Sequence, residues 1–310
     1  MKVWLNGSIA DAGEARIDPA DRGFLLGDGL FETMLARNGH AVFLEEHLLR
    51  LMRGAETIGL VLPHSPEELA EACLSLLEAN DLQEAERAAL RLTLTRGPGP
   101  RGLALPPEPR PTVLIGATPA APPPERLSAA IVTPRRNPWS PSARLKALPY
   151  LDNVLAKEEA REKSAGEALM LDTSGHVACA SAANLFIWEG DTLLTPPDRG
   201  AILPGITRAA VLELAPDLGI EAREEEITPA RLVEADGAFL TNSLMGLIPL
   251  SRVDGREIPP CPTTARLTAA YELVLDASAK DECALFAVGA VPRRRRAPPR
   301  HAAYTCQPRR

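Results

Sequence analysis

The chain has 310 residues, a length that predicts two domains. Hydrophobic residues make up 45% of it and charged residues 24%, which excludes a disordered or fibrous protein and allows sizeable apolar cores. The net charge is −7, but seven arginines and no acid fall in 291–310, so residues 1–290 hold 27 basic and 41 acidic side chains and carry −14. Because nucleic-acid binding needs clustered cations, so acidic a body excludes nucleic acid as the main partner.

Helix and strand signals organise the first part of the chain. Apolar residues at helical spacing predict a helix over 43–60. Ser65, Pro66 and Glu68 are typical of a capped helix start. Leucines alternate with polar residues over 90–95, which predicts a strand with one buried face, and the Gly- and Pro-rich stretch 96–102 must be a loop. We therefore expect a small N-terminal α/β domain over 1–117.

A proline-rich segment, TPAAPPP from Thr118 to Pro124, excludes regular helix and paired strand, so we expect a stiff linker over 118–126. Beyond it we expect an α/β or α+β domain over 127–276, and then a basic, disordered tail over 277–310, with anion or RNA binding as the tail's alternative role. The expected strands contain the apolar runs 129–132, 168–171, 185–188 and 238–240, and the expected helices are 152–163, 206–214 and one after Pro262.

Other signals bear on compartment and metals. No stretch approaches the roughly 18 apolar residues of a membrane helix, and the start of the chain turns polar too early for a signal peptide, so we expect a cytoplasmic protein without a membrane partner. The cysteines are odd in number and lack C-x-x-C spacing, which indicates reduced thiols. The histidines show no ligand spacing, so we expect packing roles and no metal. These residues are Cys73, Cys179, Cys261, Cys283 and Cys306, and His40, His47, His64, His176 and His301.

The lysines are few enough to interpret singly, since the chain has only five. Lys146 lies among apolar residues and has no acid near it until Asp152. An amine in such surroundings loses the stabilisation of its charge, which lowers its pKa and suits a lysine that forms an imine with a carbonyl. The alternative is a lysine that snorkels from a strand edge, and the local sequence leaves both open.

A candidate anion site lies in the segment LPGITR, 203–208, where a turn and a glycine precede a helix. The free N–H groups of a helix start and the hydroxyl of Thr207 suit a phosphate, although an ordinary capped helix has the same pattern. Arg50 lies on the first predicted helix and faces either solvent or a ligand. A lysine, an arginine and a phosphate-ready helix start are together what pyridoxal phosphate requires.

These residues belong to a series of motifs in chain order: DRGFLLGDGLFET (21–33), EHLLRL (46–51), LKAL (145–148), ANLF (183–186), LPGITR (203–208) and NSLM (242–245). The series resembles the class IV aminotransferases, the fold-type IV pyridoxal-phosphate enzymes, over roughly residues 2–275. The resemblance implies a two-domain fold with the cofactor in the cleft between the domains, a small-molecule amino substrate, and a homodimer.

The resemblance also implies roles for single residues. Lys146 would bind the cofactor and act as general base. The phosphate would be held by Arg50, Ile206 and Thr207, with a further hydroxyl from Ser243. The backbone around Ser243 and Leu244 would face the carboxylate of the substrate.

Within the family, the chain is similar to the 4-amino-4-deoxychorismate lyases, which release pyruvate and 4-aminobenzoate. Thr33 matches a threonine associated there with lyase chemistry, and the loop 96–102 is also similar, so we expect Thr33 to be catalytic and Arg96 to bind substrate. The segment 203–208 is equally similar to branched-chain and D-amino-acid transaminases, which are the alternative.

One residue departs from the family pattern. Cys179 stands where the family has a glutamate that pairs with the pyridine nitrogen of the cofactor, and a neutral thiol is a poor substitute for a carboxylate. Three explanations stay open: a thiolate, another acid that reaches in, or a ring that works unprotonated. The departure also keeps a non-catalytic cofactor-binding protein as a rival to an enzyme, beside a plain α/β binding module without cofactor.

Overall fold

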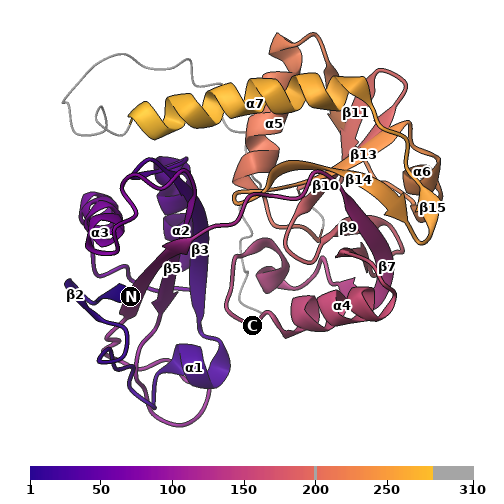
Figure 1. Cartoon of the computed structure of the whole chain (residues 1–310). Coiled ribbons are helices and arrows are strands. Elements are labelled where there is room, and N and C mark those ends of the chain that lie inside the picture. The colour runs from indigo at the N-terminus through magenta and orange to yellow at the C-terminus, as the bar shows by residue number, and fades with distance from the viewer. Residues whose placement is uncertain (199–200, 282–310) are drawn as a thin grey trace.

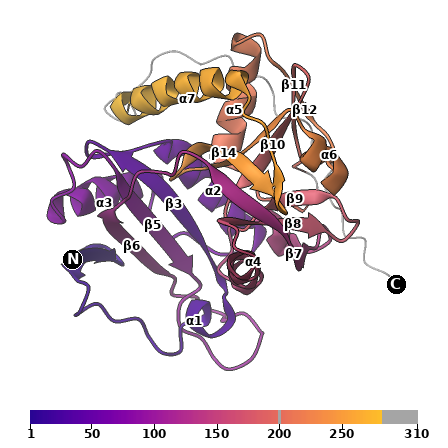
Figure 2. The same ribbon diagram turned by 45° about the vertical axis from the view of Figure 1, so that its right-hand side comes forward.

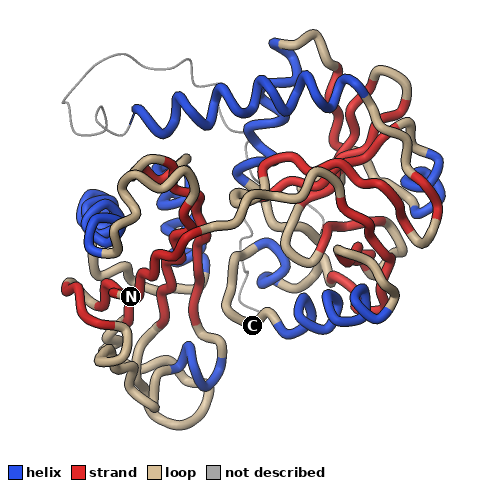
Figure 3. Tube along the Cα trace, in the orientation of Figure 1, coloured by secondary structure: helices blue, strands red, loops and turns tan. Residues whose placement is uncertain are grey.

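Two β-sheets, each with an apolar core, lie on either side of the segment 120–126 (Figure 1), and a further buried cluster joins Leu35 and Val42 to the C-terminal half. The structure is a computed structural model and describes residues 1–198 and 201–281. Strands cluster in these two sheets, and the helices lie around them (Figure 3). We propose that the two sheets with their helices correspond to the two expected domains.

The N-terminal sheet is antiparallel, with the strand order β2-β1-β6-β5-β3-β4. Its strands are β1 (Lys2–Leu5), β2 (Ser8–Asp11), β3 (Gly29–Arg37), β4 (His40–Ala41), β5 (Ala88–Thr95) and β6 (Thr112–Pro119), and its helices are α1 (Arg22–Leu26), α2 (Leu44–Thr57) and α3 (Pro66–Ala79). The helices α2 and α3 cover one face of this sheet (Figure 2). The leucines of β5 point into the core beneath them, as the alternation over 90–95 predicted.

The start of α3 confirms the predicted capping box. The Ser65 hydroxyl accepts from the Glu68 N–H at 3.2 Å, and the Glu68 carboxylate accepts from the Ser65 N–H at 2.7 Å. We expect Ser65→Ala to lower the free energy of unfolding by about 1 kcal/mol, because it leaves a helix N–H without its partner. Urea unfolding measures the loss, and Ser65→Asp, which retains an acceptor, should restore most of it.

The expected linker begins too early. Thr118 and Pro119 are paired with Ala89 and Ala88 as the last residues of β6, so the connector is 120–126. Ala120 donates to the Arg87 carbonyl at 3.1 Å, so the alternation of an antiparallel ladder turns the nitrogen of Pro119 away from β5. A proline at this strand end therefore costs no ladder bond, which is why the strand tolerates it.

The C-terminal sheet is mixed, with the order β12-β11-β10-β13-β14-β7-β8-β9, and β15 pairs with β14. Its strands are β7 (Leu127–Arg136), β8 (Glu167–Asp172), β9 (Val177–Ala180), β10 (Asn184–Glu189), β11 (Thr192–Thr195), β12 (Glu221–Glu224), β13 (Gly237–Asn242), β14 (Gly246–Val253) and β15 (Arg256–Glu257). The helical elements are the 3₁₀ turn η1 (Pro141–Arg144), α4 (Leu151–Glu162), α5 (Ile206–Asp217), α6 (Pro229–Glu234) and α7 (Pro262–Asp281). The four predicted apolar runs lie in β7, β8, β10 and β13.

The last helix, α7, is longer than expected and joins the two halves. Tyr271, Leu275 and Ala279 are buried at four-residue spacing, so one face of the helix packs beyond the predicted boundary at 276. The same helix also contacts the N-terminal half, because Glu272 of α7 pairs with Arg37 of β3 at 2.7 Å. The rest of the predicted tail, 282–310, lies outside the described residues, with its seven arginines, Cys283, Cys306 and His301. Among the helices that the structure describes, none has the length and apolar run needed to cross a membrane.

Candidate active site

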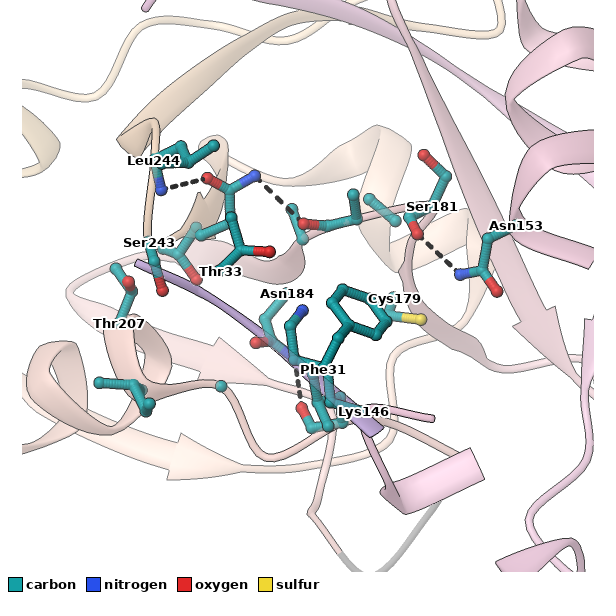
Figure 4. Close-up of a pocket in the computed structure, with 18 of the residues that line it drawn as sticks. Phe31, Thr33, Lys146, Asn153, Cys179, Ser181, Asn184, Thr207, Ser243 and Leu244 are labelled. Carbon is teal, nitrogen blue, oxygen red and sulfur yellow. Dashed lines mark hydrogen bonds between the residues drawn. The ribbon is translucent and has the colours of Figure 1, made fainter. Parts of the chain in front are cut away.

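A cavity of about 440 Å³ lies between the two sheets (Figure 4). Eight of the nine predicted site residues line it: Thr33, Arg50, Lys146, Cys179, Ile206, Thr207, Ser243 and Leu244. They come from β3 and α2 in the N-terminal half and from the Lys146 segment, β9, α5 and the β13–β14 turn in the C-terminal half. Folding therefore brings together motifs that lie up to 211 residues apart in the sequence.

Lys146 projects into the cavity from the segment between η1 and α4. The segment is fixed against β3, because Leu30 bridges to Ala147 and the Phe31 N–H donates to the Lys146 carbonyl at 2.9 Å. The amine nitrogen lies 4.5 Å from the centroid of the Phe31 ring. Burial lowers the pKa of Lys146, the cation of Arg50 lowers it further, and Glu32 only partly opposes them, so that the pKa is about 8. The site thus favours a reactive amine over the snorkelling alternative.

This lowered pKa gives a testable pH dependence. In cofactor-free protein, we expect Lys146 to react with trinitrobenzenesulfonate with a midpoint near pH 8, because only the neutral amine is nucleophilic and the lower pKa makes it available earlier than at the ordinary 10.5. Peptide mapping of samples labelled across pH 6–11 measures the profile of each lysine. A midpoint for Lys146 at the ordinary 10.5 would contradict the assignment.

The phosphate-ready end of the cavity is the start of α5. Gly205 precedes the helix and caps it with no side-chain hydrogen bond, so the first N–H groups lack a side-chain acceptor. A Cβ at Gly205 would lie 2.0 Å from the Asn184 side-chain oxygen, which explains why glycine is needed there. The hydroxyl of Thr207 accepts a hydrogen bond from Tyr271 at 3.2 Å. These groups have the free donors that an anion requires, and the anion site in the segment 203–208 stays a prediction.

Arg50 completes this end and is held by an acid that sequence reasoning missed. Glu32, 1% exposed, accepts two hydrogen bonds from the guanidinium, at 2.8 and 2.5 Å, and a third Arg50 nitrogen donates to the Pro204 carbonyl at 3.1 Å. Burial would raise the pKa of Glu32, but the hydrogen bonds and charges of Arg50 and then His47 outweigh it and lower the pKa to about 2. Glu32 is therefore ionised and fixes the position of Arg50, which lines the cavity.

His47 corrects the expectation of a simple packing role. It is fully buried, its Nδ1 lies 2.7 Å from Glu32, and its Nε2 lies 3.3 Å from the Ser243 hydroxyl. Burial lowers the pKa of His47, and Glu32 only partly opposes this, so the ring is neutral near pH 7. His47 thus connects Glu32 to Ser243 across the cavity wall. The sequence contained a signal for the role of His47, because His47 and Arg50 are three residues apart on one face of the predicted helix.

The turn after β13 positions the predicted substrate end, with one correction. The Asn242 side chain accepts from the N–H groups of Leu244, at 3.1 Å, and Met245, at 2.7 Å. The Leu244 carbonyl accepts from Arg87. Both polar backbone groups of Leu244 are therefore engaged within the protein and are not free for a substrate carboxylate, whereas the Ser243 hydroxyl lines the cavity.

Arg96 is not where the sequence suggested. It is buried outside the cavity lining, where it pairs with Asp28 at 2.9 Å and donates to the carbonyls of Ile58 and Gly59 at 2.8 and 2.9 Å. It holds the loop 96–102 to the N-terminal core, so the assignment of Arg96 to the substrate does not hold. Two other arginines line the cavity instead, Arg91 from β5 and Arg136 from β7.

Arg91 and Arg136 keep their charge available. Arg91 stacks over the Phe31 ring, 4.0 Å from its centroid, and is paired with no acid among the described residues. Arg136 donates to the carbonyls of Ala201 at 3.1 Å and Ala143 at 2.5 Å, which are neutral acceptors. Strand alternation marks Arg91 as solvent-facing, and it is indeed exposed, but it faces the solvent that fills the cavity, which the sequence pattern does not reveal.

Cys179 lies in the cavity wall on β9 and is 6% exposed. Burial raises the pKa of its thiol, and the cation of Arg136 offsets this only in part. The side chain is therefore a neutral thiol at neutral pH, which argues against the thiolate explanation. Within the described residues, no group of His, Cys, Asp and Glu side chains is arranged to hold a metal ion.

The sequence profile described as Amino-transferase class IV matches residues 29–253, which run from the start of β3 to the end of β14. The chain belongs to the class IV aminotransferase family. As a member of this family it is a pyridoxal-phosphate-dependent enzyme, which confirms the expected cofactor and removes the two non-catalytic rivals.

The relatives of this class IV family member are named for different activities. A Methanocaldococcus jannaschii protein provisionally named branched-chain-amino-acid aminotransferase is 37% identical over 83% of this chain and 90% of the relative. The D-alanine aminotransferase of Bacillus licheniformis is 32% identical over 90% and 99%, and the aminodeoxychorismate lyase of Bacillus subtilis is 30% identical over 88% and 92%. The names therefore do not single out one activity.

A solved structure is similar over nearly the whole chain. The branched-chain aminotransferase from Thermoproteus uzoniensis, crystallised with norvaline, superposes with a TM-score of 0.83 at 33% identity, covering 92% of this chain and 97% of that chain. The expected fold-type IV architecture of this class IV family member is thereby confirmed.

The cavity residues fit the family cofactor. Arg50, the N–H groups at the start of α5 and the hydroxyls of Thr207 and Ser243 are donors suited to a phosphate dianion. The lowered pKa of Lys146 suits an amine that attacks a carbonyl carbon. These groups line one cavity, as a cofactor that carries both a phosphate and an aldehyde requires.

Proposed function

We propose that this class IV family member is a 4-amino-4-deoxychorismate lyase, which converts its substrate to pyruvate and 4-aminobenzoate. The observation that carries the proposal is the charge of the cavity. Beyond the phosphate-binding Arg50, the lining presents Arg91 and Arg136 without acidic partners among the described residues. Two additional cations suit an amino donor with two carboxylates, which aminodeoxychorismate has and the donors D-alanine and a branched-chain amino acid lack.

The residues divide the reaction between them. Pyridoxal phosphate, when bound, supplies a carbonyl that joins the substrate amine and a ring that draws electrons from the adjacent carbon. The neutral amine of Lys146 takes the proton from that carbon, as its lowered pKa permits. The electron pair makes the six-membered ring aromatic and breaks the ether bond to the enolpyruvyl group. The leaving group takes up one proton and departs as pyruvate, so atoms balance without water or an oxidant.

Thr33 is the proposed source of hydrogen bonding to the leaving group. It lies on β3 opposite Arg91 of β5, and both line the cavity. A hydroxyl beside a cation suits an oxygen that gains negative charge as the ether breaks. Thr33→Val preserves the shape of the side chain and removes the hydroxyl, so it should lower lyase turnover while cofactor binding stays unchanged.

The alternative is a branched-chain or D-amino-acid transaminase, which the names of the relatives favour. In that case Lys146 would return the proton to the cofactor and a keto acid would be released. The test compares products from aminodeoxychorismate with products from a panel of L- and D-amino acids plus 2-oxoglutarate. We expect 4-aminobenzoate and pyruvate. If keto acids form from the panel and no 4-aminobenzoate appears, the lyase proposal is wrong.

A homodimer in the cytoplasm is part of the proposal. A large set of apolar side chains is exposed near α1, the 96–110 loop and α4: Phe24, Leu25, Leu26, Leu103, Leu105, Trp139, Leu151, Val154 and Leu155. Phe24 is 78% and Trp139 86% exposed, which is unfavourable in water unless another surface covers them. A second copy of the chain is the partner we propose, because it would carry the same apolar surface.

This dimer gives a prediction with an internal control. Leu151→Asp, on the apolar surface of α4, should shift the particle mass from about 66 kDa, twice the 33.2 kDa chain, to that of a monomer in light scattering. Leu273→Asp places the same charge at an exposed leucine of α7, outside this surface, and should leave the mass unchanged. A monomeric parent protein would refute the dimer.

A further inference from the structure

The cavity lining has one sign of charge. Four cationic side chains line it: Arg50, Arg91, Arg136 and Lys146. Among the residues that the structure describes, no aspartate or glutamate lines it. A bound phosphate and the carboxylates of a substrate neutralise these cations, but no acidic side chain is left to face the pyridine ring of the cofactor.

The two buried acids nearest to this lining are committed elsewhere. Glu32 is bound to Arg50 and His47. Glu167, 3% exposed, accepts from the Ser181 hydroxyl and from the Ala168 N–H at 2.8 Å, and its second oxygen pairs with Lys157 at 3.0 Å. The explanation that another acid reaches in is therefore not supported by either of them.

The side chains that line the cavity around Cys179 are neutral or positive. The buried thiol faces the cavity, and burial raises its pKa, so it carries no charge at neutral pH. The charges that act on it are those of Arg136, a cation bound only to carbonyls, and Glu167, already described. Burial also raises the pKa of Tyr150 on the same cavity, so its phenol is uncharged too.

These contacts determine the protonation state that the protein can support. A proton on a buried pyridine nitrogen adds a cation, which a nearby carboxylate would favour and a nearby guanidinium disfavours. We infer that this cavity leaves the ring nitrogen of bound pyridoxal phosphate unprotonated, with the thiol of Cys179 as its neutral neighbour. The inference requires only that the cofactor binds, and it deepens the proposed function, on which its consequence for the reaction rests.

An unprotonated ring draws electrons less strongly, so this cavity favours reactions with another source of driving force. The proposed lyase reaction has one, because its product gains an aromatic ring. Transamination lacks it and depends more on the cofactor ring. The neutral wall at Cys179 and the lyase proposal therefore support one another, although each has its own test.

The test is nitrogen NMR of protein loaded with pyridoxal phosphate that carries ¹⁵N in the ring. We expect the wild-type resonance at the position of a neutral pyridine at pH 7, and we expect Cys179→Glu to move it to the position of a pyridinium. Cys179→Ser, a matched neutral substitution, should leave it in place. A pyridinium resonance in the wild type would overturn the inference.

Glu167 is tested in the same experiment, because its bond to Ser181 offers an indirect path for negative charge. We expect Glu167→Gln to leave the resonance unchanged, and movement from a pyridinium to a pyridine position would show that this acid protonates the ring and that the inference is wrong. Wild-type protein that binds no labelled cofactor would instead overturn the cofactor assignment and the lyase proposal. If Cys179→Glu does not fold, a pH titration of the wild-type resonance decides, and a pyridinium that persists to pH 8 overturns the inference.

Discussion

Replacing Lys146 with alanine will lower the turnover of the cofactor-loaded enzyme by at least about 10²–10⁴-fold, the range expected for a lost general base. The effect should be among the largest of any single substitution, because the same amine is the proposed attachment point for the cofactor and the group that moves the substrate proton. The pKa of about 8 explains why this lysine can do both, since an appreciable fraction is neutral near pH 7.5. Steady-state rates with the substrate identified in the product test measure the loss.

Two controls separate chemistry from charge. Lys146→Arg retains a cation in the cavity but has no neutral amine at accessible pH, so we expect it to be as inactive as the alanine variant. Lys163→Ala removes the lysine that directly follows α4 and pairs with Glu159 at 2.8 Å on the surface, and it should leave turnover unchanged. Appreciable activity in both Lys146 variants would contradict the proposed role.

Replacing Glu32 with glutamine will reduce both stability and cofactor affinity. Glu32 is the only acid paired with Arg50 in the described structure, so its neutralisation leaves a partly buried guanidinium without a counter-charge. Breaking a buried ion pair in this way costs about 3–5 kcal/mol. Urea unfolding at pH 7 measures the loss of unfolding free energy, and titration with pyridoxal phosphate measures the loss of cofactor affinity. Glu45→Gln, at the exposed start of α2, is the matched control and should change neither.

The pH dependence of this effect has a definite sign. Because the pKa of Glu32 is lowered from 4.5 to about 2, its contribution to stability is full above about pH 4.5 and is lost as the pH falls through 2. The difference in unfolding free energy between wild type and Glu32→Gln should therefore shrink over that interval. A difference that stays constant from pH 7 to pH 2 would show that the Glu32 charge is not responsible.

Local signals predicted the parts of the site that local chemistry determines. The apolar neighbours of Lys146 made it a candidate and left a snorkelling lysine open, and a glycine that precedes a helix indicated the candidate anion site. The capping box at Ser65 and the strand over 90–95 are likewise determined by neighbouring residues. Each of these features depends on interactions within a few residues, so the sequence pattern contains it.

The missed features all depend on contacts between distant segments. Arg96 is in a polar loop, but Asp28, 68 residues earlier, draws it into the N-terminal core. Glu32 lies in a strand that is buried on both faces and shows no alternation, and the exposed position of Arg91 on β5 borders a cavity only because the C-terminal half lies opposite it. The end of α7 depends on which of its faces the core covers. Periodicity gives no information on these pairings.

Borohydride reduction tests directly whether pyridoxal phosphate is attached to Lys146. Protein loaded with the cofactor is reduced, digested and mapped by mass spectrometry. We expect a phosphopyridoxyl group on the peptide that contains Lys146, and none in Lys146→Ala protein treated identically. Label on another lysine of the wild type, or no label at all, would contradict it.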